Sequence, residues 1–246
     1  MNHSESGYGD LDFRIDMRRH IWPGKLIAVS GIDASGKTTL IRCIAAEARR
    51  RSIVVRRFKF PSRELKDTAL FREFDRDRQG SLDRGFIDPF GLTLVLMGDR
   101  LLTLHNQVRS HLQAGHTVII DRYLFTTLVE FLLTPHSAAE RRAVWSCAGH
   151  FPRPDCYLFA DVPVEVAADR LRDRGGAEAE SIDLEGMSMR AKLFREFAKL
   201  NDGISVRTDI GLAHSMRAVR ERLIAIDALP SQACGTRIVA SAREQR

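Results

Sequence analysis

The sequence predicts an α/β fold of three layers, α/β/α, in which helices cover both faces of a five-stranded parallel sheet. Short apolar segments alternate with amphipathic segments of helical period, an order typical of such a sheet. The strands are expected at 26–29, 53–58, 116–120, 155–161 and 204–207. The helices are expected at 37–51, 64–82, 89–114, 124–133, 138–149, 162–171, 187–200 and 212–228. Because a helix separates successive strands, the strands should run parallel.

The length of the chain, 246 residues, suits one α/β domain with a substantial core. We expect this domain at 21–228, entered through the turn-forming Trp22-Pro23-Gly24. The polar residues 1–20 show no usable periodicity and should form a flexible leader. The tail, 229–246, carries no clear signal.

A glycine-rich turn joins the first strand to the first helix. It reads Gly31-x4-Gly36-Lys37-Thr38, the pattern of a P-loop in its expected strand–loop–helix context. The glycines let successive N–H groups point into one concavity that binds phosphate oxygens, and the helix N-terminus adds partial positive charge. Lys37 can reach the outer phosphates, and the Thr38 hydroxyl is placed to ligate Mg²⁺. The sequence therefore predicts a P-loop NTPase fold that binds a nucleoside triphosphate through Gly31, Ser35, Gly36, Lys37, Thr38 and Thr39.

A carboxylate follows the third strand, at Asp121-Arg122-Tyr123. At the carboxyl end of a buried strand, beside a P-loop, Asp121 is positioned to hold Mg²⁺ directly or through water. Arg122 could bind a phosphate. The alternative is an aspartate that only caps the next helix.

Two further arginines lie in positions that suit an anion. Arg63 follows Phe60-Pro61 at the carboxyl edge of the sheet, where open α/β folds bind ligands. Asp99-Arg100 interrupts the apolar helix 89–114, so this charge pair needs a solvent-facing position or a ligand. Each arginine could also be an ordinary surface residue.

Three arginines, Arg170, Arg172 and Arg174, precede Gly175-Gly176 and an acidic, small-residue segment at 177–185. This order suggests a mobile lid that closes over bound phosphates and excludes water. A solvated helix end would explain some of these arginines equally well.

Composition excludes several other classes of protein. The net charge of +6 comes from arginines in short groups, so most should lie on solvated helix faces and nucleic acid is not expected as a partner. No apolar run approaches the length of roughly 20 residues that spans a bilayer, and residues 1–16 lack the layout of a secretory signal. The four scattered cysteines suit reduced thiols in the cytoplasm, with no zinc site.

The order of these signals resembles the thymidylate kinase family of nucleoside-monophosphate kinases, over about 25–226. Residues 31–39, Gly-Ile-Asp-Ala-Ser-Gly-Lys-Thr-Thr, resemble its P-loop, with an acidic residue at Asp33. Phe60-Pro61-Ser62-Arg63 matches its Phe-Pro-x-Arg loop, and Asp121-Arg122-Tyr123 matches its Asp-Arg-Tyr signature. Asp99-Arg100 and the segment from Pro154 to Arg170 also have counterparts there.

The resemblance implies a role for each matched position. Lys37 and Thr38 would serve ATP and Mg²⁺, with Asp121 near the metal. Asp33 would meet the sugar 3′-hydroxyl. The acceptor monophosphate would be surrounded by Arg63, Arg100 and Arg122, behind the Phe60 loop. The implied activity is ATP-dependent phosphorylation of a deoxynucleoside monophosphate, dTMP to dTDP.

Several positions depart from the family pattern. Leu96 stands where the family has a phenylalanine that stacks on thymine, and Phe131, preceded by Glu130, stands where it usually has a polar reader of the base. These changes should weaken discrimination for thymine. Neither Ala34 nor 177–180 supplies a basic residue, so an arginine for the transition state must come from 170–174, with Arg174 as the catalytic candidate.

Two alternatives therefore stay open: a P-loop kinase for another acceptor, such as a modified pyrimidine nucleotide or a nucleoside, and a non-catalytic nucleotide-binding regulator. Family members are commonly dimers. The apolar helix at 90–104 could supply a homodimer face or could belong to the core.

Overall fold

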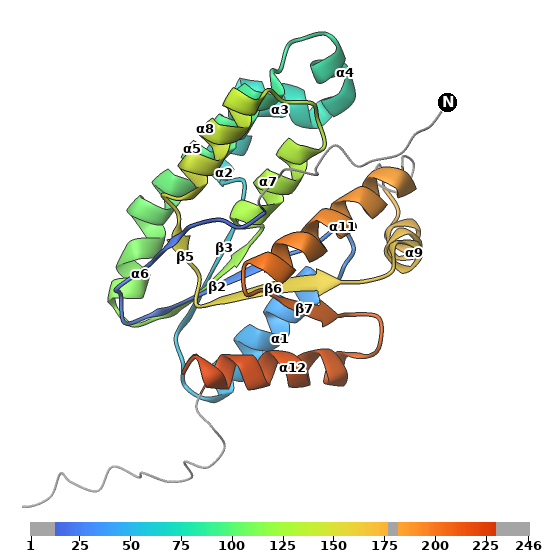
Figure 1. The fold of residues 1–246 in the computed structure, drawn as a ribbon. Coiled ribbons are helices and arrows are strands. Elements are labelled where there is room, and N and C mark those ends of the chain that lie inside the picture. Colours follow the sequence, from blue (N-terminus) through green and yellow to red (C-terminus); the bar gives the residue numbers. More distant parts are fainter. Residues whose placement is uncertain (1–12, 177–181, 230–246) are drawn as a thin grey trace, which may run out of the picture.

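A computed structural model describes residues 13–176 and 182–229 (Figure 1). The first part of the expected leader, most of the expected lid and the tail beyond residue 229 lie outside these residues.

The centre of the molecule is a five-stranded sheet in which every neighbouring pair is parallel. The strand order is β3-β4-β2-β6-β7, so the first strand of this sheet along the chain, β2, lies in its middle. The strands are β2 (Lys25–Ser30), β3 (Val55–Lys59), β4 (Thr117–Asp121), β6 (Cys156–Asp161) and β7 (Ile204–Arg207). All their carboxyl ends meet at one edge, which is where the P-loop begins.

Helices cover both faces of this sheet and complete the three layers (Figure 1). On one face, α1 (Lys37–Arg50) and α12 (Leu212–Ala225) pack against a core that includes Ile27 and Val29 of β2. On the other, the core includes Leu26 and Ala28 and is covered by α5 (Pro89–Thr103), α7 (Leu124–Leu132), α8 (Ala138–Ala148), α9 (Val164–Arg174) and α11 (Leu184–Leu200). The predicted three-layer α/β/α fold is confirmed.

Two predicted helices are subdivided. In place of one helix at 64–82 the chain forms α2 (Arg63–Lys66), α3 (Ala69–Arg76) and α4 (Arg78–Asp83). Each starts at a capping side chain, Ser62, Thr68 or Asp77, that accepts a backbone N–H bond, and such caps compete with helix continuation. The helix predicted at 89–114 runs through α5, a π-helical turn (Leu104–Val108) and α6 (Arg109–Gln113).

The segment from 13 to 20 differs from the expected flexible leader. Phe13, Ile15 and Met17 are buried, and the residues between them are exposed. Asn201, at the end of α11, fastens this segment: its Oδ1 accepts from the backbone N–H of Ile15 at 2.8 Å, and its Nδ2 donates to the Phe13 carbonyl at 2.8 Å. The chain then forms β1 (Arg18–Arg19), which pairs in parallel with β5 (Pro152–Arg153). The period-two alternation of apolar residues at 13, 15 and 17 was the signal for this docking.

Within the described ranges, none of the helices combines the length and the apolar character needed to cross a membrane.

Candidate active site

The loop between β2 and α1 has a backbone that requires glycine at its start. Gly31 has φ 144°, and a Cβ atom there would lie 2.6 Å from the carbonyl oxygen of Ala160 on the neighbouring strand β6. Gly36, with φ 86°, turns the chain into α1. The two glycines of the motif therefore let the loop curl closely over the end of the sheet.

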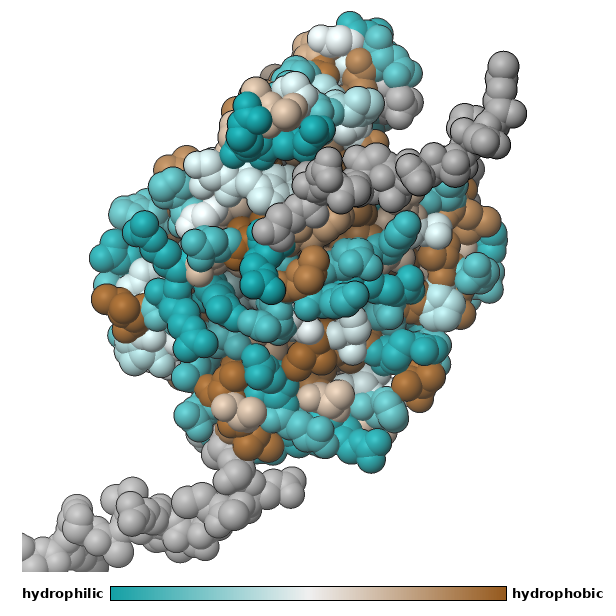
Figure 2. All heavy atoms as spheres, in the orientation of Figure 1, coloured by the Kyte–Doolittle hydropathy of each residue, from teal (hydrophilic) through white to brown (hydrophobic). Residues whose placement is uncertain are grey.

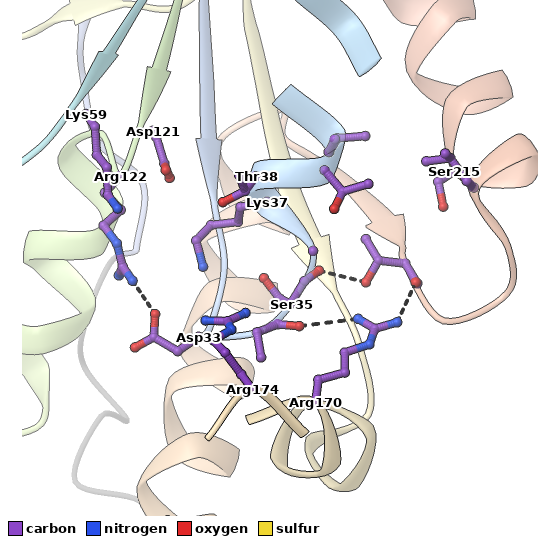
Figure 3. Close-up of a pocket in the computed structure, with 16 residues that line it drawn as sticks. Asp33, Ser35, Lys37, Thr38, Lys59, Asp121, Arg122, Arg170, Arg174 and Ser215 are labelled. Carbon is purple, nitrogen blue, oxygen red and sulfur yellow. Dashed lines mark hydrogen bonds and ion pairs between the residues drawn. The ribbon is translucent and has the colours of Figure 1, made fainter. Parts of the chain in front are cut away.

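A pocket of about 500 Å³ opens beside this loop (Figure 3). It brings together predicted residues from four elements. They are Asp33, Ser35, Gly36, Lys37, Thr38 and Thr39 of the loop and α1, Asp121 at the end of β4 with Arg122 directly after it, and Arg174 of α9. The sequence interpretation missed five other lining residues: Leu40, Lys59, Thr208, Leu212 and Ser215. Lys59 ends β3 and Thr208 directly follows β7, so their position at strand ends was the available signal.

Lys37 lies inside the loop it would serve. Its side chain is only 7% exposed, and Nζ donates to the carbonyl oxygens of Gly31 at 3.0 Å and Ile32 at 2.5 Å. Burial, helped by the positive charge of Arg122, lowers the pKa of Lys37 to about 8. Because burial makes the charged form of Lys37 unfavourable, contact with an anion would stabilise the positive charge of this side chain.

Asp33 and Arg122 form an ion pair across the mouth of the pocket (Figure 3). Burial alone would raise the pKa of Asp33, but the charges of Arg122 and Lys37 hold this pKa below its usual value. Burial would likewise lower the pKa of Arg122, but Asp33 and Asp121 raise it. The backbone of Arg122 has φ 65°, an unusual conformation for a residue other than glycine, and its N–H donates to Val29 of β2 at 2.9 Å. This backbone turns the guanidinium back over the P-loop.

Asp121, the last residue of β4, is buried, and its Oδ1 has no hydrogen-bond partner. Lys59 stands opposite it in the register of β3 and β4, and the exposed Thr38 lies in the same pocket. An unpartnered carboxylate oxygen and a hydroxyl are the hard oxygen donors that Mg²⁺ prefers. These residues therefore fit a Mg²⁺ ion held between protein and phosphate oxygens.

The three arginines at the end of α9 have different positions. Arg170 donates to the carbonyl oxygens of Ala34 at 3.3 Å and of Thr208 at 2.9 Å, so it braces the P-loop from behind. Arg172 pairs with Asp169 at 2.6 Å on the exposed surface. Arg174 lines the pocket, near the loop (Figure 3). Arg170 and Arg174 thus both line the pocket, whereas Arg172 does not.

Arg100 is fully inside the protein. Its side chain lies over the ring of buried Phe60, 5.1 Å from the centroid, and donates to the carbonyl oxygens of Leu96 at 2.8 Å and Arg122 at 3.4 Å. Its Nε has no partner, and burial lowers its pKa to about 10. Arg100 thus lies directly behind the Arg122 turn, outside the lining of the pocket.

Five of the predicted acceptor residues are not among those that line the pocket: Phe60, Arg63, Leu96, Arg100 and Phe131. The side chain of Arg63, the first residue of α2, is 91% exposed, and its Nε lies 3.6 Å from Oδ2 of Asp67, which caps the end of this helix. Phe131 is 2% exposed and stacks on His136 with ring centroids 3.7 Å apart, so this ring belongs to the core.

Leu96 is half-buried on α5, one helical turn before Arg100. Glu130, next to Phe131, is exposed and pairs with Arg190 of α11. The positions expected to contact the base are therefore occupied by the aliphatic Leu96 and lie next to the ion pair between Glu130 and Arg190.

Comparison with known proteins identifies the family of this chain. The family model for thymidylate kinase matches residues 29–209. A thymidylate kinase of Rhodopirellula baltica is 26% identical over 217 residues, which cover 85% of this chain and 82% of that protein. A thymidylate kinase of Xylella fastidiosa is 29% identical over 171 residues, 70% of this chain and 74% of that protein. A probable thymidylate kinase of Saccharolobus solfataricus is 28% identical over 152 residues, 61% and 71% respectively.

The matched range includes the P-loop, the Asp121-Arg122 turn and the arginines of α9, and it covers well over half of the chain. The chain belongs to the thymidylate kinase family of nucleoside-monophosphate kinases.

Proposed function

We propose that this protein transfers the terminal phosphoryl group of ATP to the phosphate of dTMP, forming ADP and dTDP. The observation that carries the proposal is the pocket itself. A P-loop with a buried Lys37 forms one side, and Arg122 and Arg174 approach it from two other elements. That arrangement offers positive charge to two phosphate groups at once.

The reaction needs alignment more than acid–base chemistry. The acceptor phosphate is already anionic at neutral pH, so no strong general base is required. Lys37 and the loop N–H groups would bind the outer phosphates of ATP, and Arg122 would hold the acceptor phosphate. Arg174 would neutralise negative charge on the phosphoryl group during its transfer. Mg²⁺, held by Thr38 and Asp121, would supply further charge neutralisation at the phosphate oxygens.

Asp33 would contact the sugar of the acceptor. Its carboxylate is half exposed at the mouth of the pocket and can accept a hydrogen bond from a 3′-hydroxyl. Asp33 is also paired with Arg122, so an arriving acceptor phosphate would displace the Asp33 carboxylate from the Arg122 guanidinium.

A second candidate acceptor is a pyrimidine monophosphate other than dTMP. The burial of Phe131 against His136 favours it, because no polar side chain from position 131 is available to bond the edge of thymine. The expectation of a homodimer stays a prediction. Leu94, Val95 and Leu102 of α5 are exposed, and size measurement in solution tests whether a second copy covers them.

Coupled ADP release with a panel of nucleoside monophosphates tests the function. Turnover of dTMP far above that of dUMP, dCMP and UMP supports dTMP as the acceptor. Comparable turnover of several pyrimidines supports the second candidate. Tight ATP binding without ADP release from any monophosphate would refute both and favour a nucleotide-binding regulator.

A further inference from the structure

Thr208 contacts the P-loop from outside the loop. It directly follows β7, and its Oγ1 donates to the carbonyl oxygen of Ser35 at 2.7 Å (Figure 3). The two segments also pack closely, since a Cβ atom on Gly36 would lie only 3.3 Å from Cβ of Thr208. Thr208 therefore meets the loop at the last two residues before α1.

Thr208 is itself held in place from two other elements. Its backbone N–H donates to the carbonyl oxygen of Asp161, the last residue of β6, at 3.0 Å, and its carbonyl oxygen accepts from Arg170 of α9 at 2.9 Å. The hydroxyl has a single proton and two acceptors within reach, the carbonyl oxygens of Ser35 at 2.7 Å and of Asp161 at 3.2 Å. The shorter distance is the usual one for an O–H···O bond, so the proton belongs to the bond with Ser35. The hydroxyl therefore has a fixed position from which it can orient the loop.

Burial distinguishes this hydrogen bond from those on the surface. Figure 2 shows hydrophilic side chains over much of the visible face of the molecule, where water competes for hydrogen bonds. Ser35, in contrast, is 0% exposed. Loss of the Thr208 hydroxyl would leave the Ser35 carbonyl oxygen without this donor in a place that water does not reach, which is costly.

The carbonyl group of Ser35 and the N–H of Gly36 belong to one peptide unit. This unit is planar and trans, so its carbonyl oxygen and its N–H point in opposite directions. Because the carbonyl oxygen faces Thr208, the Gly36 N–H points away from Thr208. The Thr208 hydroxyl thus sets the direction of an N–H group in the loop.

We propose that Thr208 is a positioning residue for the donor nucleotide: its hydroxyl keeps the Ser35–Gly36 peptide in the orientation that presents the Gly36 N–H to the phosphates. Without the hydroxyl, this peptide can rotate and turn its carbonyl oxygen toward the phosphates, whose negative charge it repels. Gly36 makes such a rotation easier, because glycine adopts many backbone conformations at little cost. The inference rests on the proposed function in one respect, since it assumes that the P-loop binds the phosphates of ATP.

A direct contact between Thr208 and the nucleoside makes a different prediction. Thr208 lines the pocket together with Leu212, so its side chain could touch the base or the sugar of ATP instead of acting through the loop. Inorganic tripolyphosphate separates the two roles, because it has phosphates but no nucleoside. A residue that acts through the loop should affect the binding of ATP and of tripolyphosphate alike, whereas one that touches the nucleoside should affect only ATP.

Calorimetry with T208V and T208S tests the inference, with the Kd of Mg²⁺-ATP measured directly and that of Mg²⁺-tripolyphosphate by displacement of ATP. T208V keeps the shape of the side chain and removes the hydroxyl, so both Kd values should rise about fivefold to tenfold, the factor expected for one hydrogen bond. T208S keeps the hydroxyl and removes the methyl group, and both Kd values should stay within about twofold of native. Urea unfolding shows whether each variant is folded, and T208A repeats the test if T208V is not.

Thr93 of α5 provides a matched control. It is buried outside the pocket lining, and its Oγ1 donates to the carbonyl oxygen of Pro89 at 2.9 Å. T93V makes the same chemical change as T208V and should leave both Kd values within about twofold of native.

Four results would overturn the inference. They are native-like binding of both ligands by T208V, a loss of affinity for ATP alone, equal losses in T208S and T208V, and failure of tripolyphosphate to displace ATP from the native protein. Absence of ADP release from the native protein with every monophosphate would instead refute the proposed function, because the binding measurements do not depend on turnover.

Discussion

Asn201 should be one of the most sensitive polar positions in the fold. Its amide makes three buried hydrogen bonds: it accepts from Ile15 N–H at 2.8 Å and donates to the carbonyl oxygens of Phe13 at 2.8 Å and Phe197 at 2.9 Å. Asn201→Ala removes all three and leaves the Ile15 and Phe13 backbone groups without these partners. At about 1 kcal/mol for each net bond, with an added penalty for orphaned groups, the free energy of unfolding should fall by about 2–4 kcal/mol.

Urea unfolding followed by circular dichroism measures this loss, and hydrogen exchange at residues 13–17 reports whether the N-terminal segment has detached. Lys199→Ala, an exposed substitution on the same helix, is the control and should change the free energy of unfolding by less than about 0.5 kcal/mol. Two results would refute the reasoning: a loss for Asn201→Ala no larger than for the control, or undiminished exchange protection at residues 13–17.

Three other predictions concern the site. Arg122→Ala should lower kcat/KM for the acceptor by about 100-fold or more while the Kd for ATP changes little, and an equal loss of ATP binding in calorimetry would contradict its assignment to the acceptor. Lys37→Met should raise the free energy of unfolding at pH 7 by about 1–3 kcal/mol, because the folded pKa of Lys37 is lowered to about 8 from 10.5. This gain in the free energy of unfolding should be full below pH 8 and should shrink as the pH rises from 8 to 10.5. In that range Lys37 loses its proton in the folded native protein but keeps it in the unfolded chain. A gain that does not depend on pH in urea titrations would count against this explanation. Arg170→Ala should raise the KM for ATP several-fold, because it removes the hydrogen bond to the carbonyl oxygen of Ala34 and loosens this turn. Arg172→Ala removes only a surface ion pair and should leave this KM unchanged. Equal effects of the two substitutions in ADP-release assays would disprove the bracing role of Arg170.

The sequence predicts most of the residues that line the P-loop pocket, because the topology of the sheet decides where they lie. Residues at the carboxyl ends of parallel strands must meet at one edge, so Lys37 and Asp121 converge whatever the details of packing. The same rule applied to Lys59 and Thr208 would have found two more lining residues. Local pattern and strand order therefore carry this part of the prediction.

The acceptor side was harder to predict because it depends on side-chain direction. Phe131 is buried in the core and stacks on His136, and Arg63 is the exposed first residue of the short helix that Ser62 caps. The segment at 13–17 was missed for a related reason. Its three apolar residues are separated by charged ones, and only the distant Asn201 shows what they dock against.

The hydrogen bond from Thr208 Oγ1 to the carbonyl of Ser35, at 2.7 Å, spans 173 residues of sequence. It has a consequence for the order in which the protein is made. At typical rates of synthesis, Thr208 leaves the ribosome on the order of ten to thirty seconds after Ser35. The middle strand β2 and the turn after it are thus translated well before Thr208, which braces this turn. A nascent chain therefore carries the turn without this brace until another 173 residues have been added.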